Sequence, residues 1–431
     1  MFLLYSVVLG LTIIVTGPYW LWEMLRHGKY RAGLRERLGI IPSRVRAGTR
    51  KCIWIHAVSV GEVLAISELA RALQSDLSDH RVVISTTTDT GQNLAASRFG
   101  SENVFYFPLD FAFAVRRWFA VLKPDLVILA ETEFWPNFLR VAAEQEARVA
   151  VVNARISDRS LRGYRRWRSL LPRVLQSIDV FLAQTPEDRR RLIEIGAPEA
   201  RVRVTGNLKF DVPPPRSCDI VQQLRTGLEN SHAGPLLVCG STVEGEEGML
   251  VKAFEEVAKR YPEMVMLVAP RHPERFEEVT RVLTNHGVPF RKRSRWQGES
   301  LNGSILLVDS IGELAGLYAL ADIAFVGGSL VPRGGHNIIE PAQHSVPVLV
   351  GEYTENFRDI VNIFRLGDAV RVVTPDQLGR TLLSLLDADT ERQNMGKRAR
   401  DVLESQRGAT RRTLNELKTL MARPAHEVQP A

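Results

Sequence analysis

Short apolar runs alternate with longer stretches of mixed polarity along most of the chain. The runs are four to seven residues long and rich in Val, Ile and Leu, which is typical of strands buried on both faces. The stretches between them repeat apolar residues at helical spacing. This alternation predicts strand–helix units around a parallel sheet. In the first half of the chain the predicted strands are 52–58, 81–85, 104–107, 126–130, 148–153 and 180–183.

The second half repeats the same alternation after an interruption. Residues 209–217 include three consecutive prolines, which fix the backbone and remove hydrogen-bond donors, so this segment is interpreted as a linker. The sequence therefore predicts an α/β protein with two doubly wound, Rossmann-like domains, whose sheets face a ligand-binding cleft with their carboxyl ends. The strands predicted for the second domain are 236–239, 264–269, 305–308, 323–326, 346–350 and 370–373.

The N-terminus differs from both halves. Residues 1–22 contain no charged residue and are close to the ~20 residues that cross a hydrocarbon core. The segment lacks the positively charged start and the small-residue cleavage site of a removable signal peptide, so an uncleaved membrane anchor helix is expected. Tyr19, Trp20 and Trp22 would lie at the membrane interface. A buried core helix, or a re-entrant segment bent at Gly17-Pro18, are the alternatives.

Charge is concentrated directly after this segment. The net charge is +7, but residues 26–51 carry nine Lys or Arg against one Glu, so the rest of the chain is close to neutral. A neutral body argues against nucleic-acid binding. The basic run instead indicates a cytoplasmic side facing anionic lipids of a membrane. The predicted parts are an anchor over 1–25, a first domain over 26–211, a second domain over 212–422 and a tail over 423–431.

Composition narrows the chemistry further. The chain has 431 residues, of which 45% are hydrophobic and 24% charged, as in ordinary globular proteins. Three scattered cysteines exclude a disulfide framework or a zinc cluster. The nine histidines show no ligand spacing, so no metal site is predicted.

Candidate catalytic residues lie in the loops after predicted strands of the first domain. Ser59-x-x-Glu62 follows the first strand, and it is interpreted either as a helix capping box or as a general base beside the open backbone of Gly61. Glu131 and Glu133 follow the fourth strand, at an end that points into the cleft or begins a helix. Lys209 is expected to face the same space.

Candidate anion-binding residues lie in the second domain. Arg271 follows a strand and can bind phosphate oxygens with its guanidinium. The loop 327–337 contains two Gly-Gly pairs, whose N–H groups are expected to bind a phosphate at a helix N-terminus. Glu340 follows in that helix and could accept both ribose hydroxyls of a nucleotide.

Taken together and in order, these motifs resemble the 3-deoxy-D-manno-octulosonic acid (Kdo) transferases of Gram-negative bacteria. The resemblance extends from the N-terminal apolar segment to about Leu386. One departure is Val243, where many members have histidine. The motifs are Ser59-Val60-Gly61-Glu62, Glu131 to Asn137, Asn153-Ala154-Arg155, Gly206 to Asp211, Ser241 to Glu247, Pro270 to Phe276 and Gly327 to Glu340.

The resemblance implies a GT-B glycosyltransferase that transfers Kdo from CMP-Kdo to the lipid A precursor in the inner membrane, with inversion and without a metal or other cofactor. Another GT-B sugar-nucleotide enzyme and a non-catalytic membrane scaffold are the alternatives. Carried over by motif, Glu62 matches the catalytic base, and Glu131 and Lys209 match the pair that supports the transition state. The positions that match CMP contacts are Pro270, Arg271, Ile311, Gly312, Glu313, Asn337, Ile338, Ile339 and Glu340.

Overall fold

The computed structural model describes residues 2–27, 32–45, 51–167, 170–214 and 219–422. The chain forms two units, Met1–Val212 with Gln406–Ala431, and Pro213–Ser405. Four members of the basic segment (Lys29, Arg31, Arg46 and Arg50), the end of the predicted linker and the predicted tail lie outside the described residues.

The first unit is built on a parallel sheet in the order β3-β2-β1-β4-β5-β6-β7. After β1, the chain adds β2 and β3 on one side of it, and then β4 to β7 on the other side. The strands are β1 (Lys51–His56), β2 (His80–Thr86), β3 (Val104–Tyr106), β4 (Pro124–Ala130), β5 (Arg148–Ala154), β6 (Val180–Ala183) and β7 (Val202–Val204).

Helices cover both faces of this sheet. In β1, Trp54 packs into an aromatic cluster on one face, whereas Ile53 and Ile55 pack under helices on the other. Burial of successive strand residues on opposite faces explains the continuous apolar runs of the sequence. The helices are α2 (Leu34–Arg37), α3 (Val60–Asp76), α4 (Asp89–Phe99), α5 (Ala112–Leu122), α6 (Pro136–Glu144), α7 (Asp158–Arg166), α8 (Leu171–Leu175), α9 (Pro186–Glu194) and α18 (Ala409–Ala422), with short turns η1 (Ser43–Val45), η2 (Ser101–Asn103), η3 (Glu199–Arg201) and η4 (Leu208–Asp211).

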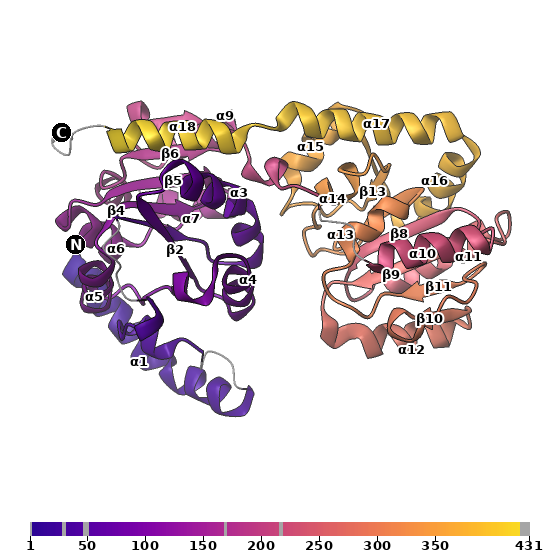
Figure 1. Ribbon diagram of the computed structural model, residues 1–431, viewed down its shortest axis with the longest axis horizontal. Coiled ribbons are helices and arrows are strands. Elements are labelled where there is room, and N and C mark those ends of the chain that lie inside the picture. The colour runs from indigo at the N-terminus through magenta and orange to yellow at the C-terminus, as the bar shows by residue number, and fades with distance from the viewer. Residues whose placement is uncertain (1, 28–31, 46–50, 168–169, 215–218, 423–431) are drawn as a thin grey trace. The chain divides into compact units, whose positions relative to one another are not determined.

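The C-terminal helix α18 belongs to the first unit, although the sequence placed residues up to 422 in the second domain. Leu414 and Leu417 pack into the same core as α3, and Asp211 accepts the N–H groups of Gly408 and Thr410. Figure 1 shows α18, in yellow, beside the first unit. The chain therefore returns to its first unit after completing the second.

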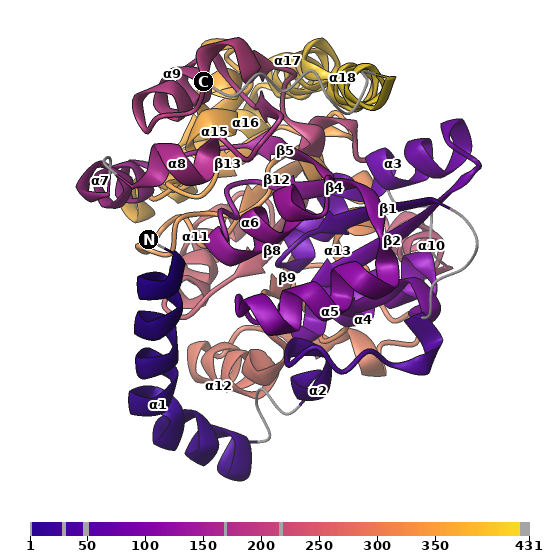
Figure 2. The same ribbon diagram turned by 90° about the vertical axis from the view of Figure 1, so that its left-hand side faces the viewer.

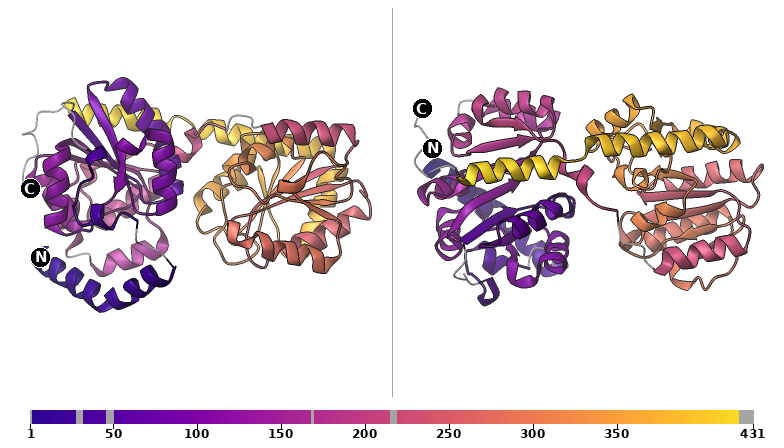
Figure 3. Two further views of the ribbon diagram at one scale, coloured as in Figure 1. Left: turned by 60° about the horizontal axis from the view of Figure 1, so that its bottom comes forward. Right: turned by 45° about the horizontal axis from the view of Figure 1, so that its top comes forward.

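The second unit repeats the design with a parallel sheet in the order β10-β11-β9-β8-β12-β13-β14. Helices flank this sheet (Figure 3). Its strands are β8 (Leu236–Thr242), β9 (Val265–Pro270), β10 (Phe290–Lys292), β11 (Ile305–Leu307), β12 (Ile323–Val326), β13 (Val348–Val350) and β14 (Val370–Val372). Its helices are α10 (Asp219–Asn230), α11 (Glu247–Ala258), α12 (Phe276–His286), α13 (Leu314–Leu317), α14 (Ile339–Ala342), α15 (Arg358–Leu366), α16 (Pro375–Asp387) and α17 (Asp389–Gln406), with turns η5 (Pro273–Arg275), η6 (Arg293–Arg295) and η7 (Tyr318–Leu320).

The N-terminal segment forms helix α1 (Phe2–His27), which contains Pro18 and changes direction in its second half (Figure 2). Its first turns dock on the first unit, where Tyr5 hydrogen-bonds Asp110 and Ser6 lies 3.0 Å from the Asn137 amide. Within the described part of the chain, no helix has the length and apolarity needed to cross a membrane. The predicted membrane-spanning anchor is therefore not supported.

Candidate active site

Two carboxylates meet at the carboxyl edge of the first sheet. Glu62 lies in the first turn of α3, which follows β1, and Glu131 directly follows β4. These strands are neighbours at the point where the strand order reverses. Open parallel sheets bind ligands at such a switch point because the loops on its two sides diverge there. The structure thus brings together two of the catalytic residues predicted from the sequence.

The Glu62 carboxylate is positioned by its own loop. Its Oε2 accepts the N–H of Val58 at 2.7 Å, and its Oε1 accepts the Ser59 hydroxyl at 3.1 Å. Ser59 makes no side-chain hydrogen bond to the helix backbone. The capping box is therefore not formed. Glu62 accepts the N–H of Val58, the residue before the cap, and the Ser59 hydroxyl binds Glu62 instead of the helix backbone. This arrangement orients the carboxylate and leaves it half-buried.

The surroundings of Glu62 suit a group that exchanges protons near neutral pH. Burial raises the pKa of Glu62 to about 7, and the negative charges of Glu131 and Glu133 add to this rise. The hydrogen bonds from Val58 and Ser59 favour the ionised form of Glu62, so they act against this rise of its pKa. A carboxyl with this pKa can both hold and release a proton at physiological pH.

Glu131 is bound by the third predicted catalytic residue. Its Oε1 lies 3.3 Å from the Nζ of Lys209, and both side chains are mostly buried. Glu131 has a left-handed backbone, with φ of 57°, which is uncommon outside glycine. Backbone strain of this kind is one feature of functional sites.

Two asparagines hold Lys209 in place. The side chain of Asn207 accepts the N–H of Lys209, and Asn153, at the end of β5, accepts the N–H of Leu208, each at 3.0 Å. Asn153 is itself left-handed, with φ of 54°. The sequence predicted that a linker begins at Lys209 and also that Lys209 faces the catalytic glutamates of a first domain ending at residue 211; these bonds fix it in the turn η4 of the first unit. Asn153 was part of a motif without a role; asparagine tolerates this backbone conformation better than most residues.

Part of the motif from Glu131 to Asn137 is structural. Trp135 donates its indole N–H to Glu133 at 2.9 Å. Asp110 accepts the N–H groups of Asn137 and Phe138 at 3.0 and 2.7 Å and thereby caps α6 from another loop. Asp110 was not identified from the sequence because the helix that it caps begins 26 residues later.

In the second unit, Arg271 and Glu340 lie at the carboxyl edge of the sheet. Pro270 ends β9, and the exposed Arg271 that follows donates its backbone N–H to Thr242 at 2.9 Å. Burial raises the pKa of Glu340, while a hydrogen bond from Asn337 and the charge of Arg271 oppose the rise. The pair combines a guanidinium for an anion with a carboxylate for hydroxyl groups.

The segment 311–313, which was predicted to contact CMP, uses its carboxylate within the protein. The Glu313 carboxylate binds the Arg293 guanidinium at 2.7 and 3.1 Å and also the Ser310 hydroxyl. Ile311 is 78% exposed, and Gly312 has φ of 88°. A ligand at this segment would therefore meet the Ile311 side chain and the Gly312 backbone, while the Glu313 carboxylate holds the loop.

The Gly-rich loop also differs from its prediction. The N–H groups of Gly328, Ser329 and Leu330 all donate to the buried carboxylate of Glu246. They are therefore occupied, and the expectation that the first Gly-Gly pair binds a phosphate through them is wrong.

The following helix α14 has only four residues. Ile338 and Ile339 are buried, so their side chains belong to the core and only their backbone can reach a ligand. Asn337 bridges Glu340 and the N–H of Ile339 at 3.1 and 3.2 Å.

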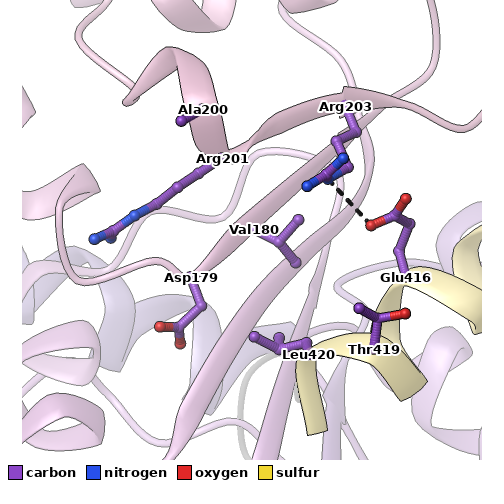
Figure 4. Close-up of a pocket in the computed structure, with 8 residues that line it drawn as sticks. All are labelled: Asp179, Val180, Ala200, Arg201, Arg203, Glu416, Thr419 and Leu420. Carbon is purple, nitrogen blue, oxygen red and sulfur yellow. Dashed lines mark ion pairs between the residues drawn. The ribbon is translucent and has the colours of Figure 1, made fainter. Parts of the chain in front are cut away.

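Two further observations concern other sites. Among the residues described, no group of three His, Cys, Asp or Glu is placed to hold a metal ion. A small cavity of about 30 Å³ lies at the N-terminal ends of β6 and β7, next to the Arg203–Glu416 ion pair (Figure 4). It has room for about one water. Glu131, in contrast, lies at the C-terminal ends of the strands of this sheet.

Comparison with known proteins agrees with these features. A family model described as 3-deoxy-D-manno-octulosonic-acid transferase (kdotransferase) matches residues 32–212. The 3-deoxy-D-manno-octulosonic acid transferase of Haemophilus influenzae is 35% identical over 92% of this chain and 93% of its own. The enzyme of the same name from Bordetella pertussis is 36% identical over 93% and 95%.

A solved structure shares the two-unit fold. It is a putative UDP-N-acetylglucosamine 2-epimerase from Listeria monocytogenes, 16% identical, with a TM-score of 0.58 over 88% of this chain and 99% of that one. The likeness extends to fold alone, that of two parallel-sheet α/β domains as in GT-B glycosyltransferases.

Proposed function

Because the chain belongs to the family of 3-deoxy-D-manno-octulosonic acid (Kdo) transferases, we propose that it transfers Kdo from CMP-Kdo to the lipid A precursor. The observation that carries the mechanism is the half-buried Glu62, whose pKa is raised to about 7 beside the Glu131–Lys209 pair. The proposed reaction inverts the configuration at the Kdo anomeric carbon and releases CMP.

Glu62 acts in this proposal as the general base. Its ionised carboxylate takes the proton of the attacking sugar hydroxyl of the acceptor. The hydroxyl oxygen then forms a bond to the anomeric carbon, and the bond from that carbon to the phosphate oxygen breaks with its electrons leaving on CMP. A pKa near the working pH is the best compromise for a base, because a large fraction is ionised and still basic enough to accept the proton.

Glu131 and Lys209 support the transition state. Positive charge develops on the anomeric carbon as CMP departs, and a fixed carboxylate nearby stabilises it. Lys209 lies 3.3 Å from Glu131, so its ammonium group pairs with that carboxylate and fixes its direction. Glu131 has a left-handed backbone and directly follows β4, at the switch point of the sheet.

The second unit holds the donor in this proposal. The exposed guanidinium of Arg271 binds the CMP phosphate, and Glu340 accepts the ribose hydroxyls. Ile311 and Gly312 contact the nucleotide through an apolar side chain and an open backbone. The other predicted contacts are assigned to backbone groups or to side chains that hold these loops in place. They are Pro270, Glu313, Asn337, Ile338 and Ile339.

The donor carries a single phosphate, whose charge the exposed Arg271 guanidinium can balance in part as CMP leaves. We therefore propose that the transfer proceeds without a divalent ion and without another cofactor. Activity retained in excess EDTA, after prior dialysis against the chelator, supports this proposal; activity restored only by added Mg²⁺ contradicts it.

The acceptor is a lipid, so the enzyme must work at a membrane surface. We propose that α1 lies on the cytoplasmic leaflet of the inner membrane and inserts its apolar side chains among the lipids. The exposed apolar residues of α1 are Leu4, Val7, Val8, Leu11, Ile13, Ile14, Val15, Tyr19, Trp20 and Trp22.

Part of the basic segment is available for anionic lipids. Arg26 and Arg35 are exposed. Arg37 and Arg44, in contrast, bind the Thr87 carbonyl and the Glu36 carboxylate within the first unit. The attraction to anionic lipid therefore comes from fewer residues than the sequence suggested.

The direct test is to incubate the purified protein with CMP-Kdo and a dispersed lipid A precursor. Mass spectrometry should show the precursor gaining the mass of Kdo, with CMP released in the same amount. Release of CMP without a glycosylated lipid would reject the proposed acceptor. No release of CMP at all would reject the proposed donor. Replacing CMP-Kdo with a UDP-sugar serves as the control for another sugar-nucleotide enzyme.

A further inference from the structure

The loop after β8, the central strand of the second unit, carries two adjacent glutamates that no catalytic role explains. Glu246 is fully buried, and its carboxylate accepts four backbone N–H groups. Oε2 accepts those of Val243 and Gly328 at 3.0 and 2.7 Å, and Oε1 accepts those of Ser329 and Leu330, each at 2.9 Å. A buried carboxylate is costly unless it is fully hydrogen-bonded, and this one is.

The hydrogen bonds of Glu246 shape the loop after β12. Three of the four donors are consecutive residues of that loop, which lies 82 to 84 residues further along the chain. Gly328 is left-handed, with φ of 69°, and a Cβ at Gly327 would come within 2.7 Å of Glu246 Oε2. The loop thus wraps around an internal anion, in the way that comparable loops wrap around a phosphate.

Glu247 shapes the loop after β9. Its carboxylate binds the Arg275 guanidinium at two positions, at 2.7 and 3.1 Å, and accepts the Thr242 hydroxyl at 2.8 Å. Both Glu247 and Arg275 are largely buried. Arg275 ends the turn that begins after Arg271, so this bidentate pair fixes the segment that carries the predicted phosphate ligand.

The position of β8 explains how neighbouring residues reach both loops. β8 lies between β9 and β12 in the sheet, so the loops that follow those two strands lie on either side of it. Glu246 and Glu247 stand at the start of α11, where successive residues point about 100° apart. One carboxylate therefore turns toward each loop.

We propose that Glu246 and Glu247 are positioning residues of the donor site, each fixing one of the two loops that hold the CMP moiety. This rests on the proposed function, because it assigns the loops after β9 and β12 to the nucleotide. Neither carboxylate contacts the donor. Their loss weakens donor binding and leaves the chemical step at Glu62 largely intact.

The test compares Glu246→Gln and Glu247→Gln with Glu244→Gln, an exposed glutamate of the same loop. Glutamine keeps the size of the side chain but turns an NH₂ group toward N–H donors that need an acceptor. We expect the KM for CMP-Kdo and the Kd for CMP to rise roughly tenfold or more in the first two variants. The kcat and the KM for the lipid acceptor change by less than about threefold, and Glu244→Gln stays unchanged.

Chemical rescue separates the carboxylate from a general packing role. Glu246→Ala leaves the four N–H groups facing a gap that a small carboxylate can enter. Formate or acetate should recover much of the CMP affinity, whereas formamide should not. Equal recovery by formamide, or CMP affinity within twofold of the wild type in Glu246→Gln, would overturn the proposal. If Glu246→Gln fails to fold, Glu247→Gln decides the matter by the same criterion.

Amide hydrogen exchange gives a readout that does not depend on the ligand. Without nucleotide, exchange at Gly328, Ser329 and Leu330 should accelerate roughly tenfold in Glu246→Gln but not in Glu244→Gln. Unchanged exchange contradicts the positioning role. Faster exchange in a protein whose wild type does not bind CMP would reject the proposed donor while leaving the loop-positioning role in place.

Discussion

The Nζ atom of Lys209 lies 3.3 Å from Oε1 of Glu131, although 78 residues separate them in the chain. The contact joins the turn after β7, at one edge of the first sheet, to the loop after the central strand β4. It depends on Asn153, whose side chain ties that turn to the end of β5. The pair is therefore a product of the whole sheet and not of a local motif.

Loss of the Lys209 charge should slow the chemical step. Lys209→Met keeps most of the side-chain volume but leaves Glu131 without the cation that orients it. We expect kcat to fall roughly 10- to 100-fold, which corresponds to about 1–3 kcal/mol of transition-state stabilisation. The Kd for CMP should not change, because the donor is assigned to the second unit. Lys209→Arg, which keeps the charge, should retain more activity than Lys209→Met; equal losses would show that the charge is irrelevant.

Glu133 should tune the proton affinity of Glu62. The negative charge of Glu133 is one cause of the raised pKa of Glu62, so neutralising it lowers that pKa. Glu133→Gln keeps an oxygen for the indole of Trp135. The acid limb of the pH–rate profile should therefore move to lower pH in this variant. A limb that stays in place or moves to higher pH would show that the two carboxylates are not coupled.

The donor assignment predicts the effect of two substitutions in the second unit. Arg271→Ala and Glu340→Ala should each weaken CMP binding by about 1–3 kcal/mol, because each removes one charge-assisted hydrogen bond. Calorimetry with CMP measures this directly. Arg281→Ala, at an exposed arginine of α12, is the matched control. Wild-type affinity in both test variants would remove the nucleotide from this unit.

The apolar face of α1 should carry membrane affinity that does not depend on charge. Leu11, Ile14 and Val15 are 57%, 72% and 77% exposed, and they lie away from the docked first turns of the helix. Replacing all three with serine should reduce binding to neutral phospholipid vesicles at least tenfold, since each loses about 1 kcal/mol or more of apolar transfer energy.

Two comparisons complete this test. Leu366→Ser, at a leucine 91% exposed in the second unit, should leave vesicle binding unchanged. Residual binding of the triple variant to anionic vesicles should disappear in ~0.5 M salt, where screening is nearly complete. If the triple variant binds neutral vesicles as well as the wild type does, α1 is not the membrane contact.

The sequence predicted the fold well where burial determines the pattern. Each of the twelve predicted strands overlaps a strand of the structure, because central parallel strands are buried on both faces and read as apolar runs. The two strands that were missed, β7 and β10, have three residues each, lie at sheet edges and contain charged residues; β3 and β14, which are equally short edge strands, were predicted. The return of α18 to the first unit was also missed, since an amphipathic pattern predicts that a helix packs on a sheet but does not say on which one.

The candidate site was predictable only in part. The sequence placed Glu62 after the first predicted strand and Glu131 after the fourth, and the structure shows that these two strands are neighbours. The roles of Asn153, Asp110 and Glu246 could not be predicted, since the partners that define these roles lie 27 to 84 residues away. The Gly-rich loop shows the consequence: its composition indicated an anion-binding loop, but the anion is the protein's own Glu246.

The central claim is that Glu62 is the general base, and the pH dependence of a single turnover tests it most directly. A protonated Glu62 cannot accept the hydroxyl proton, so the rate of Kdo transfer at saturating donor should rise with pH and reach half its plateau near pH 7. Well below that pH it should fall about tenfold per pH unit.

Glu62→Gln should lower the plateau rate about 10²- to 10⁴-fold and abolish this acid limb, with CMP affinity unchanged. Glu68→Gln, in the next turn of α3, should behave as the wild type. A wild-type rate that is flat between pH 5 and 9, or a Glu62→Gln variant that retains near-normal turnover, would contradict the assignment of Glu62 as the base.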